Sequence, residues 1–307
     1  MTRPVETIAI TGATGFVGKT TVDLALSSGF QVRALTRRDQ PEKEGITWIK
    51  GALDDQASLK SLCEGADVVL HIAGVVNAPD AAGFEAGNVT GTLAVVEAAK
   101  AASVSRFIHT SSLSAREPQL SIYGQSKERA EKIVASSGLD WTIIRPPAIY
   151  GPGDGEMLDL FKMAKRGFVL LPPNGRISLL HVQDLARLFL ALLPENEDCT
   201  AQVFEADDGA QNGWTHKGFG WAIGWAVGKR VSTISAPRRV LELASKGDKL
   251  FRGKKAKLTA DRVGYLCHDD WVISESARPP ETLWKPLIGT RQGLKETAKW
   301  YRDHKWL

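Results

Sequence analysis

A glycine-rich turn between a strand pattern and a helix pattern constrains the fold of this chain more than any other feature. The β-branched run 5–11 leads into the turn Thr11-Gly-Ala-Thr-Gly-Phe-Val-Gly18, and a helical apolar pattern follows over 19–28. A glycine motif in this strand–turn–helix context is typical of a βα unit that holds the pyrophosphate of a dinucleotide. The start of the chain is therefore predicted to be a dinucleotide-binding fold.

The glycines of this turn have different expected roles. Gly12 permits the tight turn, Gly15 lets the backbone approach a pyrophosphate, and Gly18 allows close packing of the helix on the strand. The helix N-terminus supplies free N–H groups and a partial positive charge to the phosphates. The cofactor contacts expected in this turn are Gly12, Thr14, Gly15, Phe16 and Val17.

Strand and helix patterns alternate through the first half of the chain. β-Branched runs predict strands over 5–11, 31–36, 47–50, 67–73, 105–110 and 140–145. A 3.6-residue apolar period predicts helices over 19–28, 56–63, 88–102 and 125–137. Such alternation, with right-handed crossovers, favours the α/β class: a doubly wound, Rossmann-type parallel sheet with helices on both faces.

The alternation of strand and helix patterns ends after Gly151-Pro-Gly153, where strand patterns become sparse. Seven of the nine tryptophans lie at or after Trp214. We expect a dinucleotide-binding domain over 1–153, rejoined by about 181–208, where 203–206 returns to the sheet as a late strand. Residues 154–180 and 209–307 are expected to form mainly a smaller, mixed C-terminal lobe that binds the substrate.

Bulk composition favours a globular protein of the cytoplasm. An apolar share of 43% and a charged share of 24% are ordinary for a chain with a buried core. Cys63, Cys199 and Cys267 show neither pairing nor ligand spacing, which argues against a disulfide framework or a metal site. No run approaches the ~18 apolar residues of a membrane span, and because a strand pattern begins at Val5 we expect no signal peptide. The net charge of +4 is too small to imply a nucleic-acid partner.

Basic residues concentrate in the segment 238–257. Eight of its residues are basic and only Glu242 and Asp248 are acidic, which gives a local charge of +6 against +4 for the whole chain. A solvated helix end and loop is one interpretation. The other is a surface patch that attracts an anionic partner, such as a phosphorylated or carrier-bound substrate.

Cofactor preference is expected to be set where the second strand ends. NAD-binding proteins commonly place a carboxylate there to hold the ribose 2′-hydroxyl, whereas this chain has Leu35-Thr-Arg-Arg-Asp39. A guanidinium binds a 2′-phosphate through charge-assisted hydrogen bonds, and a carboxylate repels it. The sequence therefore favours NADP(H) over NAD(H), with Arg37 as the leading contact and Arg38 as the second. Asp39 would face the ribose only if the strand ended later.

A tyrosine, a lysine and a serine form the second chemical constellation. Tyr123 and Lys127 are spaced to share one helix face, and Ser112 follows the fifth predicted strand. An unperturbed tyrosine titrates near pH ~10, so acid–base work near neutrality requires its pKa to be lowered. A lysine ammonium and an oxidised nicotinamide nearby would favour the phenolate, and the serine hydroxyl could polarise a carbonyl.

Seven segments of the chain occur in the order of one known family. They are Thr11–Gly18, His71-Ile-Ala-Gly74, Asn88-Val-Thr-Gly-Thr92, Thr110-Ser-Ser112, Tyr123-x-x-x-Lys127, Arg145-Pro-Pro-Ala-Ile-Tyr-Gly-Pro152 and His181-Val-Gln-Asp184. Together they resemble the extended short-chain dehydrogenases/reductases, the superfamily that includes NAD-dependent epimerases and dehydratases. The resemblance covers the chain from its start to about residue 190.

The resemblance implies a role for several residues. Ser112, Tyr123 and Lys127 would be catalytic, and Lys127 would also hold the nicotinamide ribose. The further residues expected near the cofactor are Ala73, Gly74, Pro146 and Ala148. The family commonly has an acidic residue near the adenine, after the third strand, but this chain has Gly51-Ala-Leu53 and then Asp54, so adenine recognition must differ.

Departures from the family pattern separate the reaction types. Ser112-Leu-Ser114 lacks the Asp-Glu pair that serves water elimination in dehydratase relatives, and Ala148 replaces an asparagine that binds the sugar diphosphate in epimerases. The pattern is closest to the branch of 3β-hydroxysteroid dehydrogenase-like and dihydroflavonol reductase-like enzymes. An NADP-type strand end also suits net reduction better than epimerisation, which retains its cofactor.

The other prominent residues are expected to be structural. The histidines His71 and His109 lie on predicted strands, His181 and Asp184 on a helix entry, and Cys267-His-Asp-Asp270 lacks metal-ligand spacing. The aromatic residues Trp214, Phe219, Trp221 and Trp225 have helical spacing. Core packing is the first interpretation of these aromatic residues, and an apolar substrate pocket is the alternative.

We therefore expect reversible hydride transfer between NADPH and the carbonyl of a small to medium, largely apolar substrate. Two alternatives remain open: a nucleotide-sugar epimerase, and a non-catalytic NADP(H)-binding accessory or sensor protein. The expected partner is a small molecule, anionic or carrier-bound if the basic segment forms a patch. Homodimers are common in the family, although no motif of this chain specifies one.

Overall fold

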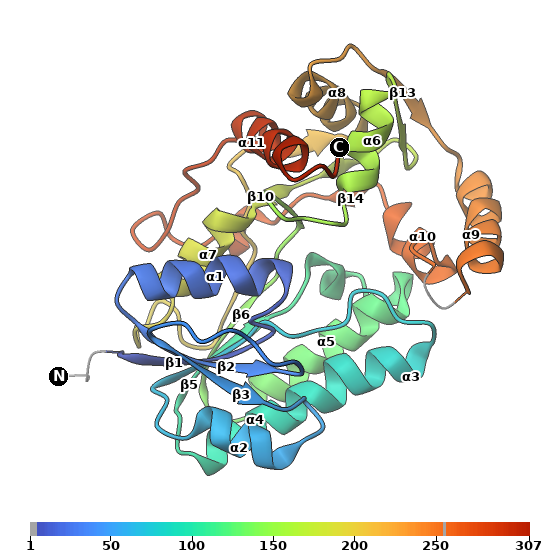
Figure 1. Cartoon of the computed structure of the whole chain (residues 1–307). Helices are drawn as coiled ribbons and strands as arrows, with labels where there is room; N and C mark the ends of the chain where they lie inside the picture. The colour runs from blue at the N-terminus through green and yellow to red at the C-terminus, as the bar shows by residue number, and fades with distance from the viewer. Residues whose placement is uncertain (1–4, 254–255) are drawn as a thin grey trace. The chain divides into compact units, whose positions relative to one another are not determined.

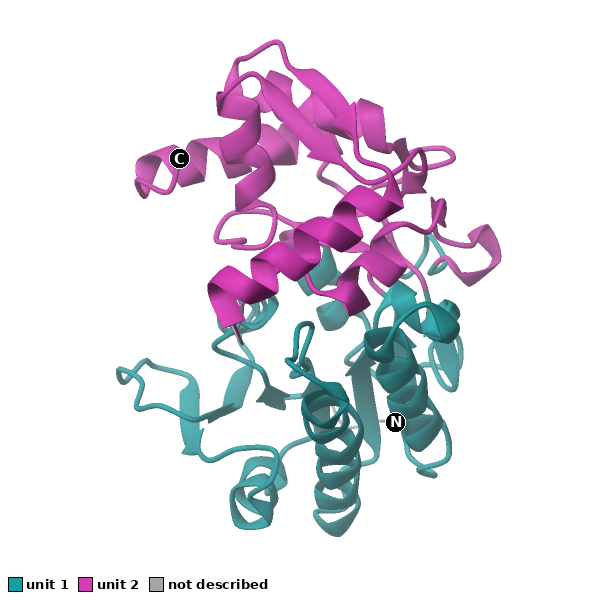
Figure 2. Cartoon of the chain, turned by 90° about the vertical axis from the view of Figure 1, so that its right-hand side faces the viewer, with its two compact units in different colours: residues 1–145, 185–204, 279–284 teal, residues 146–184, 205–278, 285–307 magenta. Residues whose placement is uncertain are grey.

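The computed structural model describes residues 5–253 and 256–307, and it divides the chain into two compact units (Figure 2). Unit 1 comprises 1–145, 185–204 and 279–284. Unit 2 comprises 146–184, 205–278 and 285–307. Each unit is therefore assembled from separate stretches of the sequence. Lys254 and Lys255 of the basic segment lie outside the described residues.

Unit 1 is built on a seven-stranded parallel sheet (Figure 1). Its strands in spatial order are β11 (Gln202–Phe204), β6 (Asp140–Ile144), β5 (Arg106–Thr110), β4 (Val68–His71), β1 (Thr7–Thr11), β2 (Gln31–Thr36) and β3 (Ile46–Lys50). Every pairing along this sheet is parallel. The expected doubly wound, Rossmann-type fold is confirmed, including the late strand that returns to the sheet.

Helices cover both faces of this sheet. One face carries α2 (Gln56–Cys63), α4 (Gly91–Ala101) and α5 (Ile122–Ala135), whose apolar side chains pack with those of the strands in a single core. The opposite face carries α1 (Phe16–Ser27) and the unit 1 part of α7 (Val182–Ala191) (Figure 1). Strands buried on both faces are nearly continuous apolar runs, as in Val68–His71, where all four residues are buried.

The strand order has a reversal point at β1. The chain moves from β1 outward to β2 and β3, then returns to place β4 on the other side of β1. In a parallel sheet all carboxyl ends meet at one edge, and the crevice for a ligand lies outside them, where the order reverses. The glycine-rich turn, which follows β1, therefore begins at this reversal point.

Three helical segments of unit 1 begin earlier than their apolar patterns predict. Helix α1 begins at Phe16, inside the glycine-rich segment, and α5 begins at Ile122 after the cap residue Ser121. The predicted helix 88–102 starts as a π-helical turn, Glu85–Thr90, which follows the short α3 (Ala81–Phe84). Apolar periodicity fails at these starts because a first turn is defined by its cap and glycines rather than by a buried face.

Unit 2 is a mixed α/β assembly with short strands. Parallel pairs join β7 (Ala148–Tyr150) to β10 (Leu179–His181) and β8 (Phe168–Leu171) to β13 (Ser232–Ser235). A third sheet contains β12 (Trp214–Thr215), β9 (Arg176–Ile177) and β14 (Asp270–Trp271). The helices are α6 (Leu158–Lys165), α8 (His216–Val227), α9 (Arg238–Arg252), α10 (Ala260–Leu266) and α11 (Thr290–Asp303). One apolar core joins α6, α8 and α11.

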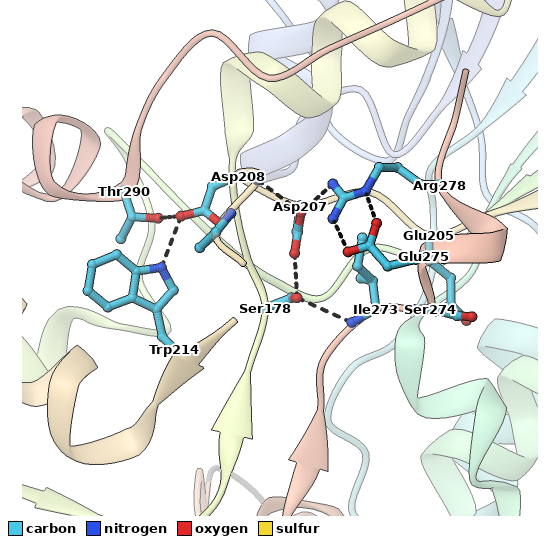
Figure 3. A network of polar contacts seen from close by, with 12 residues as sticks. Ser178, Glu205, Asp207, Asp208, Trp214, Ile273, Ser274, Glu275, Arg278 and Thr290 are labelled. Carbon is cyan, nitrogen blue, oxygen red and sulfur yellow. Dashed lines mark hydrogen bonds and ion pairs between the residues drawn. The ribbon is translucent and has the colours of Figure 1, made fainter. Parts of the chain in front are cut away.

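A buried polar network links segments of unit 2 that are distant in sequence (Figure 3). Asp207 accepts hydrogen bonds from the Ser178 hydroxyl at 2.6 Å and from the Arg278 guanidinium at 2.7 Å. Its neighbour Asp208 accepts from the Trp214 indole N–H and from Thr290. Each carboxylate is thus matched by donors, which is how a buried charge is tolerated. The network replaces long strand pairings as the tie between these loops.

The aromatic prediction for α8 was only partly correct. Phe219 is buried in the unit 2 core, but Trp221 and Trp225 are 53% and 52% exposed. Lysine ammonium groups lie over the two exposed indoles, Lys217 at 5.2 Å from Trp221 and Lys295 at 5.6 Å from Trp225. The prediction of core packing is therefore wrong for these two tryptophans.

Within residues 5–253 and 256–307, no helix has both the length and the apolar character needed to cross a bilayer.

Candidate functional site

The glycine-rich turn brings the ends of β1 and β4 into close contact. Gly12 has φ +75°, and a Cβ added there would lie 2.7 Å from the Ala73 backbone nitrogen. At Gly18 an added Cβ would lie 2.1 Å from the Gly12 carbonyl oxygen. Both positions therefore exclude a side chain: Gly12 because of its left-handed backbone and its approach to β4, and Gly18 because the helix lies on the turn.

The N-terminus of α1 is available to an anion. Its cap residue is Gly15, no side chain caps it, and its first turn contains no acidic residue. The first N–H groups of a helix have no intrahelical partner, so those of Phe16 and Val17 remain to be satisfied from outside the helix. Thr14 and Gly15 are exposed beside them. This uncapped cradle fits the pyrophosphate of a dinucleotide.

The end of β2 presents two arginines. Strand β2 ends at Thr36, whose hydroxyl donates to the Arg38 carbonyl at 2.7 Å and accepts from the Arg38 N–H at 3.3 Å. Arg37 and Arg38 are exposed, and among the described residues neither guanidinium forms an ion pair. Asp39 lies 2.7 Å from the Lys50 ammonium and is paired with it. The carboxylate that follows these arginines in the sequence is thus matched by a lysine of β3.

A directed chain of hydrogen bonds runs from the end of β4 to the start of α4. The Ala73 N–H donates to the Thr11 hydroxyl, which lies 2.7 Å from His71 Nδ1. His71 Nε2 lies 3.1 Å from Thr92, and the Thr92 hydroxyl donates to the Asn88 carbonyl at 2.6 Å. The Thr92 hydroxyl proton is already donated to the Asn88 carbonyl, so Thr92 can only accept from His71. His71 therefore donates from Nε2 to Thr92 and accepts at Nδ1 from the Thr11 hydroxyl.

His71 is held neutral in this chain. Burial, followed by the charge of Lys127, lowers its pKa to about 3. The neighbouring His109 ring stacks on it with centroids 5.3 Å apart, and burial likewise lowers the pKa of His109 well below its usual value. Neither ring nitrogen of His109 has a hydrogen-bond partner among the described residues. Both histidines are packed within unit 1, as the sequence led us to expect.

Asn88 is a site residue to which sequence analysis assigned no role. Its side chain accepts from the Val75 N–H at 2.6 Å and donates to the Val75 carbonyl and to the Ser126 hydroxyl, both at 2.9 Å. Ser126 in turn donates to the Tyr123 carbonyl at 2.7 Å. Asn88 therefore connects the loop after β4 to the helix that carries Tyr123. The segment Asn88-Val-Thr-Gly-Thr92 was noted in the sequence, but its side-chain contacts depend on tertiary structure.

Lys127 is buried at the centre of the site. Its side chain is only 4% exposed, and its Nζ donates to the Thr110 carbonyl at the end of β5 over 2.6 Å. Burial lowers its pKa to about 8, against which the charge of Glu131 acts to raise it. A Cβ added at Gly74 would lie 3.5 Å from this Nζ, so the ammonium lies next to the loop after β4.

Glu131 anchors the same helix one turn further on. Its carboxylate accepts from Arg145 Nε at 2.9 Å and Nη2 at 2.7 Å, and also from the Ser111 hydroxyl. Glu131 is buried. Because Glu131 lies on α5, Ser111 follows β5 and Arg145 follows β6, these hydrogen bonds join the three elements. Lys127 and Glu131 are four residues apart and share a helix face, which explains the electrostatic effect of the carboxylate on the lysine.

Ser112 and Tyr123 lie on either side of a short connection in unit 1. Ser112 caps the 3₁₀ turn Leu113–Arg116 by accepting from the Ser114 N–H at 3.2 Å. Tyr123 lies in the first turn of α5 and is buried, with its ring centroid 6.0 Å from that of Phe84. A Cβ added at Gly124 would lie 2.6 Å from the Ser114 carbonyl oxygen. The glycine after Tyr123 therefore allows α5 to approach the segment that carries Ser112.

The expected site residues are divided between the units. The turn residues, Arg37, Arg38, Ala73, Gly74, Ser112, Tyr123 and Lys127 belong to unit 1, whereas Pro146 and Ala148 belong to unit 2. His181 and Asp184 are also in unit 2, where Asp184 accepts from the Leu287 and Ile288 N–H groups. Asp54 is exposed, and its neighbour Asp55 caps α2. Among the described residues no cluster of side chains could hold a metal ion.

Known proteins resemble this chain both in sequence and in fold. A family model described as NAD(P)H-binding matches residues 12–166. A ceramide reductase of Caulobacter vibrioides is 34% identical over 98% of this chain and 96% of its own length. A UDP-glucose 4-epimerase of Vibrio cholerae is 27% identical over 96% of this chain and 95% of its own. The solved UDP-glucose 4-epimerase of Thermus thermophilus, in complex with NAD, superimposes with a TM-score of 0.71 at 20% identity, covering 96% of this chain and 99% of its own.

Proposed function

Because the chain belongs to the NAD(P)H-binding family and to the extended short-chain dehydrogenases/reductases, we propose that it transfers hydride between NADP(H) and a carbonyl or secondary alcohol of a largely apolar substrate. One observation carries the proposal. A buried, hydrogen-bonded lysine, a buried tyrosine one turn before it and a strand-end serine lie in the unit that also contains the uncapped glycine turn.

The chain's own residues fit a dinucleotide. In the proposed complex the N–H groups at the start of α1 bind the pyrophosphate, and Ala73 and Gly74 lie along the cofactor where β4 ends. Lys127, which has two ammonium protons left after its bond to Thr110, would hold the nicotinamide ribose. The bound nicotinamide supplies the hydride in reduction and accepts it in oxidation.

Three side chains handle the proton and the substrate oxygen. The Ser112 hydroxyl donates a hydrogen bond to the carbonyl oxygen and orients it. The Tyr123 hydroxyl gives its proton to the same oxygen as the carbonyl carbon is reduced, and it regains a proton from solvent afterwards. The Lys127 ammonium stabilises the Tyr123 phenolate between these events. With a pKa of about 8, Lys127 is largely charged at neutral pH, as this role requires.

The proposed preference for NADP(H) rests on the end of β2. Arg37 and Arg38 are exposed there and have no acidic partner among the described residues, so a 2′-phosphate would not compete with a carboxylate for them. The pairing of Asp39 with Lys50 reduces the repulsion that the carboxylate would exert on that phosphate. We therefore assign the 2′-phosphate contact to Arg37 first and to Arg38 second.

The proposed substrate is a lipid that carries a ketone. Support comes from the relative named ceramide reductase, which is 34% identical over nearly the full length of both chains. The 3₁₀ turn after Ser112 supports the reaction rather than the substrate, because Leu113, Ser114 and Ala115 offer no carboxylate for water elimination. Reduction of a ketone needs none, since the tyrosine supplies the one proton that the alcohol oxygen gains.

The experiment offers the purified protein NADPH or NADH with long-chain 3-oxo lipids and, separately, UDP-glucose. Reductase activity consumes NADPH in proportion to ketone and yields the alcohol. An epimerase, which the 27% identical relative makes the second candidate, would interconvert the sugar nucleotide without net consumption of cofactor. Tight NADPH binding without turnover of any ketone or sugar nucleotide would instead indicate an accessory or sensor protein and overturn the proposed reaction.

A further inference from the structure

Helix α9 exposes the side that an amphipathic helix normally buries. Leu243, Leu250 and Phe251 are 70%, 83% and 88% exposed, and Val240 is 52% exposed. With 3.6 residues per turn, these four side chains fall on one stripe of roughly 100° of the helix circumference. Large apolar side chains scattered singly over a surface are ordinary, but a contiguous stripe of this kind marks an interaction surface.

The rest of α9 explains why this stripe is not part of the unit 2 core. The helix packs against α10 through a narrow side containing Leu241 and Ser245, both buried, and Leu241 joins Val263 of α10 in a small apolar cluster. The apolar stripe is centred roughly 150° around the helix from Leu241 and Ser245, on the far side from this contact, and takes no part in that cluster.

Positive charge borders the stripe. Arg239, Lys246 and Lys249 follow it on one side of the helix, all exposed, and none of the three forms an ion pair among the described residues. The other charges of α9 are matched, since Arg238 pairs with Glu242 and Arg252 with Asp248. The basic segment noted in the sequence is thus divided into paired residues and an unpaired row beside exposed apolar side chains.

We propose that α9 docks on the surface of a bilayer that contains anionic lipids, with Val240, Leu243, Leu250 and Phe251 inserted among the acyl chains and the unpaired basic row on the headgroups. A helix with a wide apolar stripe flanked by lysine and arginine lies in the plane of such an interface. The two chemistries occur side by side in a bilayer, apolar chains beneath and negative headgroups above.

Charge argues against a second copy of the chain as the occupant. A symmetric dimer through this face would place the same unpaired basic row of both protomers at one interface. Like charges brought together in this way oppose association, whereas anionic headgroups attract them. Docking would bring the enzyme to a lipid substrate, but it requires neither the proposed reaction nor the cofactor, and it is tested without either.

The test is flotation of the full-length protein with vesicles of phosphatidylcholine alone or of phosphatidylcholine with phosphatidylglycerol. We expect binding to the anionic vesicles, weaker binding to the neutral ones, and loss of binding at high salt. Lys246→Gln with Lys249→Gln should weaken binding to anionic vesicles about 25-fold, since each lysine near an anionic surface contributes roughly fivefold. The paired control, Lys60→Gln with Lys162→Gln, removes the same charge from exposed positions elsewhere and should leave binding unchanged.

A second pair of variants tests the apolar stripe. Leu250→Ser with Phe251→Ser should abolish flotation with either vesicle, whereas Leu287→Ser, at a 65% exposed leucine outside α9, should not. All variants change exposed side chains, and unchanged circular dichroism and thermal unfolding would verify their fold. The proposal is overturned if the wild type does not float with anionic vesicles or if the α9 variants float as it does. Concentration-dependent dimerisation that Phe251→Ser abolishes would likewise overturn it in favour of a second copy.

Discussion

The ammonium of Lys127 donates a 2.6 Å hydrogen bond to the carbonyl oxygen of Thr110, although 17 positions separate the two residues. The bond joins the first half of α5 to the carboxyl end of β5, two elements whose separate patterns in the sequence say nothing of their contact. It fixes the position of the ammonium and leaves two protons for other partners.

Tyr123→Phe should abolish turnover while leaving the cofactor bound. Removal of a general acid costs about 10²- to 10⁴-fold in rate, and the phenyl ring retains the packing of Tyr123 against Phe84. The measurement is kcat for ketone reduction together with the Kd for NADPH by fluorescence. Ser136→Ala, at the exposed end of the same helix, serves as the control and should behave as wild type. Retained activity in Tyr123→Phe would refute the proposed proton donor.

The charge of Lys127 predicts a pH dependence. Burial lowers its pKa from 10.5 to about 8, so the folded protein loses this proton before the unfolded chain does. Between about pH 8 and 10.5 the unfolded state therefore binds more protons, and this residue makes the free energy of unfolding rise with pH. The kcat/KM for reduction should fall above about pH 8 as the ammonium is lost.

The direct measurement is the titration of the Lys127 resonance in a protein with ¹³C-labelled lysine. Assignment uses the spectrum of Lys127→Met, in which this resonance is missing. A resonance that titrates near pH 8 is expected. Titration near pH 10.5, the value of an ordinary lysine, would show that the ammonium is not desolvated as the structure indicates.

Arg37→Ala should raise the Kd for NADPH about 10- to 100-fold and change the Kd for NADH less than about twofold. Hydrogen bonds to a charged group contribute about 1.5–3 kcal/mol, and only NADPH carries the 2′-phosphate. Arg38→Ala should have a smaller effect of the same kind. Arg302→Ala, at an exposed arginine of α11, should affect neither affinity. Equal weakening of both dinucleotides by Arg37→Ala would mean that Arg37 contacts a shared part of the cofactor.

Gly12→Ala should destabilise the protein more than Gly29→Ala. Both glycines have left-handed backbones, φ +75° and +88°, so both substitutions carry a backbone cost of about 1 kcal/mol. Only the Cβ at position 12 would also meet backbone, 2.7 Å from the Ala73 nitrogen, whereas no atom of the described residues lies within 4 Å at position 29. Urea unfolding should show an additional loss for Gly12→Ala, and NADPH affinity should fall in that variant alone. Equal losses in the two variants would contradict the close approach of the turn to β4.

Glu131→Gln should lower the free energy of unfolding by about 3 kcal/mol, because it leaves the Arg145 guanidinium without its buried bidentate partner. Glu128→Gln is the matched control on the same helix. Its partner Lys132 is largely exposed, so the loss should stay below about 1 kcal/mol. Similar losses in the two variants would show that the Glu131 pair is no more than a surface contact.

The parts of this protein that the sequence alone predicted are those that depend on neighbours along the chain. The seven sheet strands, their parallel arrangement and the turn from Thr11 to Gly18 follow from local patterns of apolar residues and glycines. Arg37 and Arg38 directly follow the end of β2. Their exposure could therefore be predicted once the boundary of this strand was predicted correctly. The starts of α1 and α5 were missed because a cap, rather than a buried face, defines a first turn.

Tertiary structure alone decided which of these residues meet. The chain of hydrogen bonds from Thr11 through His71 to Thr92, and the ties of Asn88 to Val75 and Ser126, depend on crossovers that bring distant segments to one sheet edge. Apolar periodicity likewise shows that residues share a helix face, but not whether a partner covers that face. It therefore predicted burial for Trp221 and Trp225, which are half exposed, and it could not reveal that the apolar stripe of α9 is uncovered. Burial is a property of two surfaces, and a sequence pattern describes only one of them.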